Sequence, residues 1–123
     1  MEKITRLVIA DDSPHARRGQ RALLATQPGI EVVGEAGDGK EAVRLVEKNQ
    51  PDGVILDVRM PGMDGLQAAR RIKDRWPEIK VIVLSMYAAY REEALATGAD
   101  AFLVKGCPVE ELLNAIRSLG NGA

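Results

Sequence analysis

The sequence predicts one α/β domain in which helices cover both faces of a parallel sheet. Its 123 residues are enough for a single domain with its own core. Short runs of aliphatic and β-branched residues alternate with longer segments in which apolar residues recur every three or four positions. Most of the short runs are apolar throughout, which is typical of strands that are covered on both sides.

Five apolar runs are the candidate strands. Parallel strands need long crossover connections, so the segments between the runs are expected to be helices. The strands are predicted at residues 7–10, 30–35, 53–56, 81–84 and 101–104.

Capping residues mark the expected helix starts. Two of these starts have an aspartate followed three residues later by Glu or Gln, the spacing of a reciprocal capping box. Another has a serine before a proline, which favours an N-cap with proline in the first turn. Gly98 is expected to end the fourth helix. The starts are Ser13 with Pro14, Asp38 with Glu41, Asp64 with Gln67, and Pro108 with two glutamates behind it.

Composition excludes several classes of protein. The 17 Lys and Arg residues against 18 Asp and Glu residues leave a formal net charge of −1, which argues against broad electrostatic binding of nucleic acid or anionic lipid. Cys107 is the single cysteine and has no disulfide partner in the chain. There is no signal-peptide pattern and no apolar run of roughly 20 residues, so we expect a cytoplasmic protein that does not span a membrane.

The chain is expected to form one domain over residues 1–120. Residues 121–123 are small and polar, so they are expected to be a flexible tail or the start of a linker.

Polar side chains follow the predicted strands at their carboxyl ends, where open α/β sheets bind ligands. Asp11 and Asp12 follow the first strand, and Asp57 follows the third. Ser85 and Lys105 follow the fourth and the fifth. One aspartate at such a position is typical of a helix cap, but all five groups together favour a functional site.

Three carboxylates and one ammonium in a confined site have an excess of negative charge, which is unfavourable unless a cation joins them. The candidate ligands at these strand ends are aspartates, which offer only oxygen atoms. Mg2+ suits such a donor set, with carboxylates and a main-chain carbonyl holding the ion and water completing its shell. The sequence therefore predicts a weak magnesium site.

Four parts of the sequence form a recognisable pattern: residues 7–14 (LVIADDSP), residues 56–65 (LDVRMPGMDG), Ser85 and residues 98–105 (GADAFLVK). Together they resemble the receiver domain of bacterial two-component response regulators over essentially the whole chain. This resemblance implies a flavodoxin-like sheet with the strand order 2-1-3-4-5. The segments 12–17 and 34–39 are similar in particular to receivers of LuxR-type transcriptional regulators, which usually carry a C-terminal DNA-binding domain; none lies in these residues.

The resemblance also implies roles for the site residues. Asp57 is expected to be the phosphoacceptor, which takes a phosphoryl group from a sensor histidine kinase. Mg2+ is expected to be held by Asp11, Asp12 and Asp57 together with the main-chain carbonyl of Arg59. The Arg59 side chain is expected to lie over the mouth of the site.

The resemblance implies that three further residues bind the phosphoryl group or change conformation on phosphorylation. Lys105 is expected to pair with Asp57 and then with a phosphoryl oxygen, and Ser85 to bind a second oxygen. Phe102 stands where many relatives have tyrosine. It is either a switch residue that turns inward or only part of the core. Phosphorylation is expected to favour a homodimer, and the acyl phosphate to hydrolyse by self-catalysis.

Two departures from the family pattern concern the surface that passes on the signal. Lys105 is followed by Gly106 rather than by proline. The segment between Ser85 and Gly98 is about two residues shorter than in many relatives, so the fourth helix is expected to be short.

Two alternatives come from other functional classes. A haloacid-dehalogenase-type phosphatase also uses an aspartate nucleophile, but it needs a second aspartate two residues later as the general acid. Position 59 is arginine, so we expect a signalling switch and not an enzyme with an external substrate. The second alternative is a receiver-like interaction domain that works without phosphorylation, which the intact set of site residues argues against.

Overall fold

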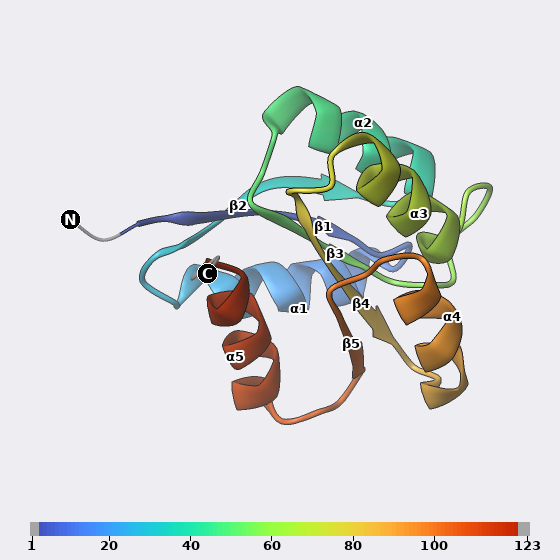
Figure 1. Cartoon of the computed structure of the whole chain (residues 1–123). Helices are drawn as coiled ribbons and strands as arrows, with labels where there is room; N and C mark the ends of the chain where they lie inside the picture. The colour runs from blue at the N-terminus through green and yellow to red at the C-terminus, as the bar shows by residue number, and fades with distance from the viewer. Residues whose placement is uncertain (1–2, 121–123) are drawn as a thin grey trace.

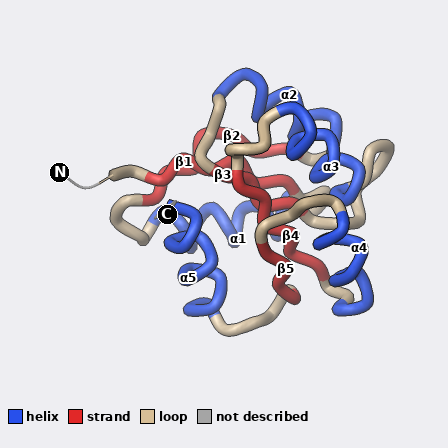
Figure 2. Tube along the Cα trace, in the orientation of Figure 1, coloured by secondary structure: helices blue, strands red, loops and turns tan. Residues whose placement is uncertain are grey.

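The computed structural model describes residues 3–120, which form a five-stranded sheet between two layers of helices (Figures 1 and 2). All neighbouring strands are parallel, in the order β2-β1-β3-β4-β5, which confirms the predicted flavodoxin-like fold. The proposed tail at 121–123 lies outside the described residues. The strands are β1 (Thr5–Ala10), β2 (Ile30–Ala36), β3 (Gly53–Leu56), β4 (Lys80–Ser85) and β5 (Ala101–Val104).

The helices divide between the two faces of the sheet (Figure 1). Helices α1 and α5 pack on one face, and α2, α3 and α4 pack on the other. No helix within residues 3–120 is long and apolar enough to cross a membrane. The helices are α1 (Pro14–Ala25), α2 (Gly39–Asn49), α3 (Gly65–Arg75), α4 (Arg91–Ala96) and α5 (Val109–Gly120), with a short 3-10 turn η1 (Ala88–Tyr90) before α4.

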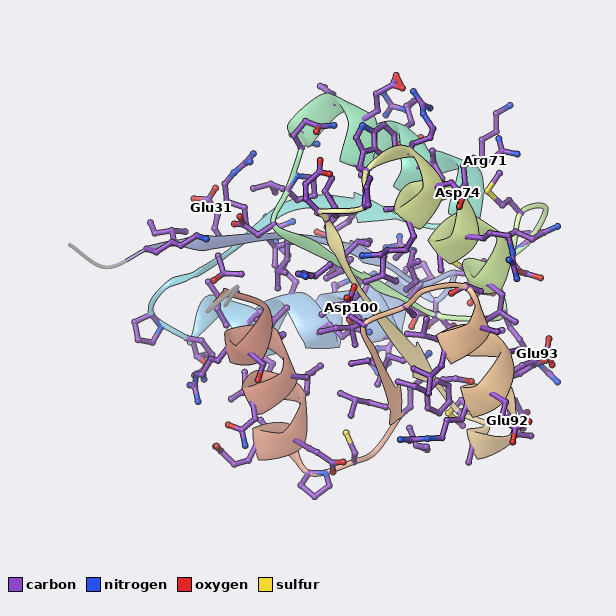
Figure 3. All side chains as sticks on the ribbon, viewed as in Figure 1. Glu31, Arg71, Asp74, Glu92, Glu93 and Asp100 are labelled. Atoms are coloured by element: carbon purple, nitrogen blue, oxygen red, sulfur yellow. The ribbon has the colours of Figure 1, made fainter. Side chains whose placement is uncertain are left out.

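The central strands supply both cores because successive side chains of a strand point to opposite faces. In β1, Leu7 and Ile9 pack under α1 and α5, while Val8 packs on the α2 and α3 side. Burying an aliphatic side chain of this size stabilises the fold by about 1.5–3 kcal/mol. The edge strand β2 is less covered, and its Glu31 is exposed (Figure 3). Three of the continuous apolar runs thus correspond to the inner strands, whereas β5 is an apolar run at the other edge of the sheet, with Val104 exposed.

The capping residues begin and end the helices largely as predicted. The Ser13 hydroxyl accepts a hydrogen bond from the main-chain N–H of Ala16 at 3.2 Å, at the start of α1. Asp64 and Gln67 form the complete capping box of α3, with distances of 2.9 and 3.0 Å. Gly98, with a φ of 95°, follows the end of α4.

The capping box predicted for α2 is only half formed. The Asp38 carboxylate accepts a hydrogen bond from the main-chain N–H of Glu41 at 2.8 Å, as expected. The Glu41 carboxylate, however, pairs with the guanidinium of Arg44 at 2.6 and 2.9 Å. A charged partner one turn along the helix competes with the weaker bond to the N-cap main chain, so the prediction of a reciprocal box was wrong here.

The segment after β4 confirms the prediction of a short fourth helix. Helix α4 has 6 residues and is entered through η1. Glu92 and Glu93 in its first turn favour the helix dipole and point to solvent (Figure 3). Ala94 is its fully buried residue.

Candidate functional site

Three aspartates meet at the carboxyl end of the sheet. Strands β1 and β3 are neighbours, with Ala10 opposite Leu56, so the residues that follow them lie side by side. One carboxylate oxygen from each of Asp11, Asp12 and Asp57 lies within 4.8 Å of the others. The ends of β1 and β3 therefore bring together the three carboxylates that were predicted to meet at this edge of the sheet.

The three carboxylates differ in exposure. Asp11 is 1% exposed and Asp57 is 8% exposed, whereas Asp12 is open to solvent. An open groove of about 530 Å³ lies beside them, lined by Asp12, Arg59 and Tyr90 among others. The site is thus buried on its sheet side and accessible on its outer side.

Lys105 joins two of the aspartates. Its main-chain N–H extends the β4–β5 ladder by donating to the Ser85 carbonyl at 2.7 Å. Its ammonium Nζ lies 3.2 Å from Asp57 Oδ2 and 2.7 Å from Asp11 Oδ2. The predicted contact with Asp57 is confirmed, but the shorter contact with Asp11 was not foreseen. The ammonium therefore supplies positive charge between the two buried carboxylates.

The pKa values of Asp57 and Lys105 reflect this arrangement. Burial raises the pKa of the Asp57 carboxyl above its ordinary value; Lys105 opposes this increase, and the charge of Asp11 adds to it. Burial works against the charged form of Lys105, yet hydrogen bonds and charges from both aspartates raise the pKa of Lys105. The lysine thus stays an ammonium, and ionised Asp57 is held at a cost in stability.

We expect Asp57→Asn to increase the free energy of unfolding of the metal-free protein at neutral pH. The pKa of Asp57 is raised in the folded state. Asp57 therefore makes its full favourable contribution to the free energy of unfolding below the unfolded pKa of about 3.9, where it is protonated, and this contribution is lost as the pH rises through the folded pKa. The stability difference should therefore be largest at neutral pH and shrink toward pH about 4. Urea unfolding in EDTA at both pH values measures it, and a variant less stable at neutral pH would contradict the expectation.

The Ser85 side chain makes no hydrogen bond to the three aspartates within residues 3–120, and Phe102 belongs to the hydrophobic core. Ser85 is the last residue of β4, and its Oγ accepts a hydrogen bond from the main-chain N–H of Tyr87 at 3.1 Å. Phe102 is 6% exposed and belongs to the same core cluster as Ala94 of α4. Its ring is thus turned inward.

The Arg59 side chain has partners that sequence reasoning missed. Its guanidinium carbon lies 4.4 Å from the centre of the Tyr87 ring, and its Nε lies 3.4 Å from the Tyr90 hydroxyl. The two tyrosine rings pack edge to face at 6.2 Å. Stacking of this kind holds a cation against an aromatic face. The role of the Arg59 carbonyl in metal binding stays a prediction.

Comparison with known proteins agrees with this fold. The family model for the response regulator receiver domain matches residues 7–117. The transcriptional regulatory protein DegU of Brevibacillus brevis is 37% identical, over 98% of this chain and 52% of DegU. This chain spans about half the length of the curated relatives it matches.

Solved structures agree as well. A two-component response regulator of the LuxR family from Aurantimonas sp. SI85-9A1 has a TM-score of 0.91 and 33% identity, over 97% of this chain and 87% of that chain. The response regulator TrrA of Thermotoga maritima, solved with Mg2+ and BeF, has a TM-score of 0.87 and 32% identity, over 94% of this chain and 99% of that chain. The chain therefore belongs to the response regulator receiver domains of two-component systems, and its relatives include LuxR-type transcriptional regulators.

Proposed function

We propose that this domain takes a phosphoryl group from a sensor histidine kinase onto Asp57 in a reaction that depends on Mg2+. The observation that carries the proposal is the cluster of Asp11, Asp12 and Asp57 with the Lys105 ammonium between two of them. A buried carboxylate with a fixed cation beside it and an open side toward solvent suits a phosphoacceptor.

The donor set fits Mg2+. All the nearby ligands are oxygens, and the exposed Asp12 leaves room for the several waters that Mg2+ retains. Asp11, Asp12, Asp57 and the main-chain carbonyl of Arg59 are the residues proposed to hold the ion. When bound, Mg2+ supplies positive charge that offsets the charge of the carboxylates and of the phosphoryl oxygens.

The chain's own groups then have distinct tasks. A carboxylate oxygen of Asp57 forms a bond to phosphorus as the P–N bond of the phosphohistidine breaks, and the electron pair leaves with the imidazole nitrogen. Lys105 pairs with one phosphoryl oxygen. Ser85 already accepts a hydrogen bond from Tyr87, so its own hydroxyl hydrogen is available for a second phosphoryl oxygen. Water later cleaves the acyl phosphate, so the chemistry is self-directed.

We propose that the signal leaves the site through the segment after β4. Movement of Ser85 toward the phosphoryl group would loosen its bond to Tyr87, whose ring supports Arg59. Phe102 is already buried and has no hydroxyl, so it contributes through packing. A homodimer on phosphorylation stays a prediction.

The wider setting is also part of the proposal. The relatives are transcriptional regulators about twice as long as this chain, which supports a C-terminal DNA-binding module outside these residues. We propose that the receiver itself does not contact nucleic acid, and that the protein works in the cytoplasm, where its kinase would phosphorylate it.

Intact-mass measurement after incubation with acetyl phosphate tests the proposal. We expect one phosphoryl adduct on the wild type with MgCl2, none in EDTA and none on Asp57→Asn. Asp74→Asn is the matched control, because Asp74 is an exposed aspartate of α3 (Figure 3) and should be phosphorylated normally. No adduct under any condition would favour an interaction domain that works without phosphorylation.

A further inference from the structure

Arg17 of α1 reaches back to the end of β1. Its Nη1 donates a hydrogen bond to the main-chain carbonyl of Asp11 at 2.5 Å. That carbonyl belongs to the peptide bond between Asp11 and Asp12. Because a peptide unit is planar, fixing its oxygen fixes the rotation of the whole unit that joins these two residues. Arg17 thereby sets the direction in which the chain leaves Asp11.

Asp12 depends on this peptide more than Asp11 does. The Asp11 carboxylate has its own hydrogen bonds, from Lys105 and from the Ser13 main-chain N–H at 3.0 Å. Asp12 is exposed, and its side chain has no hydrogen bond to another residue between 3 and 120. Its main chain is therefore what directs its carboxylate toward the other two.

Arg17 is in turn held by Glu35. Arg17 Nε lies 3.8 Å from Glu35 Oε1, and the other oxygen of Glu35 pairs with Arg21. Glu35 lies near the end of β2, opposite Ile9 of β1. The side chains of Arg17 and Glu35 are 21% and 25% exposed, so their pairing is less screened than that of a fully exposed pair. A residue near the end of β2 thus pairs with the guanidinium through Nε, while Nη1 binds the Asp11 carbonyl.

We infer that Arg17 is a positioning residue for the metal ligands, with Glu35 as its anchor, and that this pair sets the Mg2+ affinity. The inference rests on the proposed magnesium site. Arg17 acts through the main chain of the ligand loop and touches neither the ion nor the phosphoryl group.

If the Arg17 side chain is removed, a positioning role and simple electrostatics predict opposite changes in Mg2+ affinity. Removing a positive charge near three aspartates makes the site more negative, and Coulomb attraction alone would then tighten Mg2+ binding. Loss of positioning lets the Asp12 carboxylate turn away, which weakens binding. Removing a group that orients metal ligands typically weakens metal affinity by about tenfold or more.

Amide NMR titrations with MgCl2 on the whole chain distinguish the two. We expect Arg17→Ala to bind Mg2+ about tenfold more weakly than wild type. Glu35→Gln should show a smaller loss of the same sign, because Arg17 then keeps its bond to Asp11 but loses its anchor. Arg18→Ala is the matched control: Arg18 is the neighbouring exposed arginine, its removal changes the net charge equally, and it should leave the affinity unchanged or slightly tighter.

Unfolding temperatures measured on the same samples separate loss of fold from loss of positioning. If Arg17→Ala does not fold, Arg17→Met decides, since it keeps the aliphatic stem and removes the guanidinium, so that electrostatics alone again predicts tighter Mg2+ binding and loss of positioning predicts weaker binding. Equal or tighter binding by the variants, beside a wild type that binds Mg2+, would overturn the positioning role and leave the proposed function standing. A wild type that binds no Mg2+ would overturn both.

Discussion

Lys105→Met is expected to slow phosphoryl transfer to Asp57 by about 100-fold, the usual cost of removing one group that stabilises developing negative charge. Methionine is of similar length, so the change removes the charge and keeps most of the packing. The lost ammonium lies 3.2 Å from Asp57 Oδ2, where it can follow the phosphoryl oxygen as the new bond forms. The rate of adduct formation from acetyl phosphate, followed by mass, measures the effect.

The same substitution is expected to tighten Mg2+ binding. Lys105 Nζ lies 2.7 Å from Asp11 Oδ2, so it competes with a metal ion for the carboxylate of a proposed metal ligand. Slower transfer together with tighter binding would be a signature that general loss of structure does not produce. Lys48→Met, at an exposed lysine of α2, is the control and should behave as wild type in both measurements. A Lys105→Met rate equal to that of the control would rule out the proposed role.

The sequence predicted the fold well because its strongest signals are local. The inner strands are apolar throughout, and the structure places their ends within two residues of the predicted bounds. Capping aspartates and a proline also act locally, so the starts of α1 and α3 were found. Periodicity cannot say which strands are neighbours, and the strand order came from the resemblance to receivers. In that order β1 and β3 are neighbours, which puts Asp11 beside Asp57.

Features that depend on long side chains reaching between elements were missed. Neither the contact of Lys105 with Asp11 nor the hold of Arg17 on the Asp11 carbonyl has a local sequence signal. The same is true of Arg59, whose guanidinium rests on Tyr87 from the following loop. Such side chains have several rotatable bonds, so their partners are decided by the assembled fold. The charged network around the site therefore had to come from the structure.

Gly65→Ala is expected to destabilise the protein by about 3 kcal/mol, at the upper end of what overpacking costs. Gly65 is the first residue of α3, and its N–H donates to the Val58 carbonyl at 2.8 Å. A Cβ atom there would lie 1.8 Å from the main-chain oxygen of Asp57 and 2.7 Å from its carbonyl carbon. Both are backbone atoms of Asp57, the proposed phosphoacceptor, so no side-chain rotation relieves the contact.

Gly19→Ala is the matched control for this substitution. Gly19 lies inside α1, and nothing lies within 4 Å of the position that its Cβ would take. Alanine should therefore stabilise α1 by about 0.5–1 kcal/mol, because glycine in a helix loses more conformational freedom on folding. Urea unfolding of both variants measures the contrast, and a Gly65→Ala protein as stable as wild type would contradict the structure of this loop.

Gly65→Ala should also slow phosphoryl transfer to Asp57 in the fraction of the protein that is folded. The loop can accept a Cβ only if the main chain at Asp57 or the start of α3 moves. Either movement shifts the Asp57 carboxylate relative to Lys105 and Asp11, and in-line transfer depends on that geometry. Adduct formation by Gly65→Ala should therefore be slow even at temperatures well below its unfolding transition, whereas Gly19→Ala should react at the wild-type rate. The close approach at Gly65 thus couples the stability of the loop to the position of the Asp57 carboxylate.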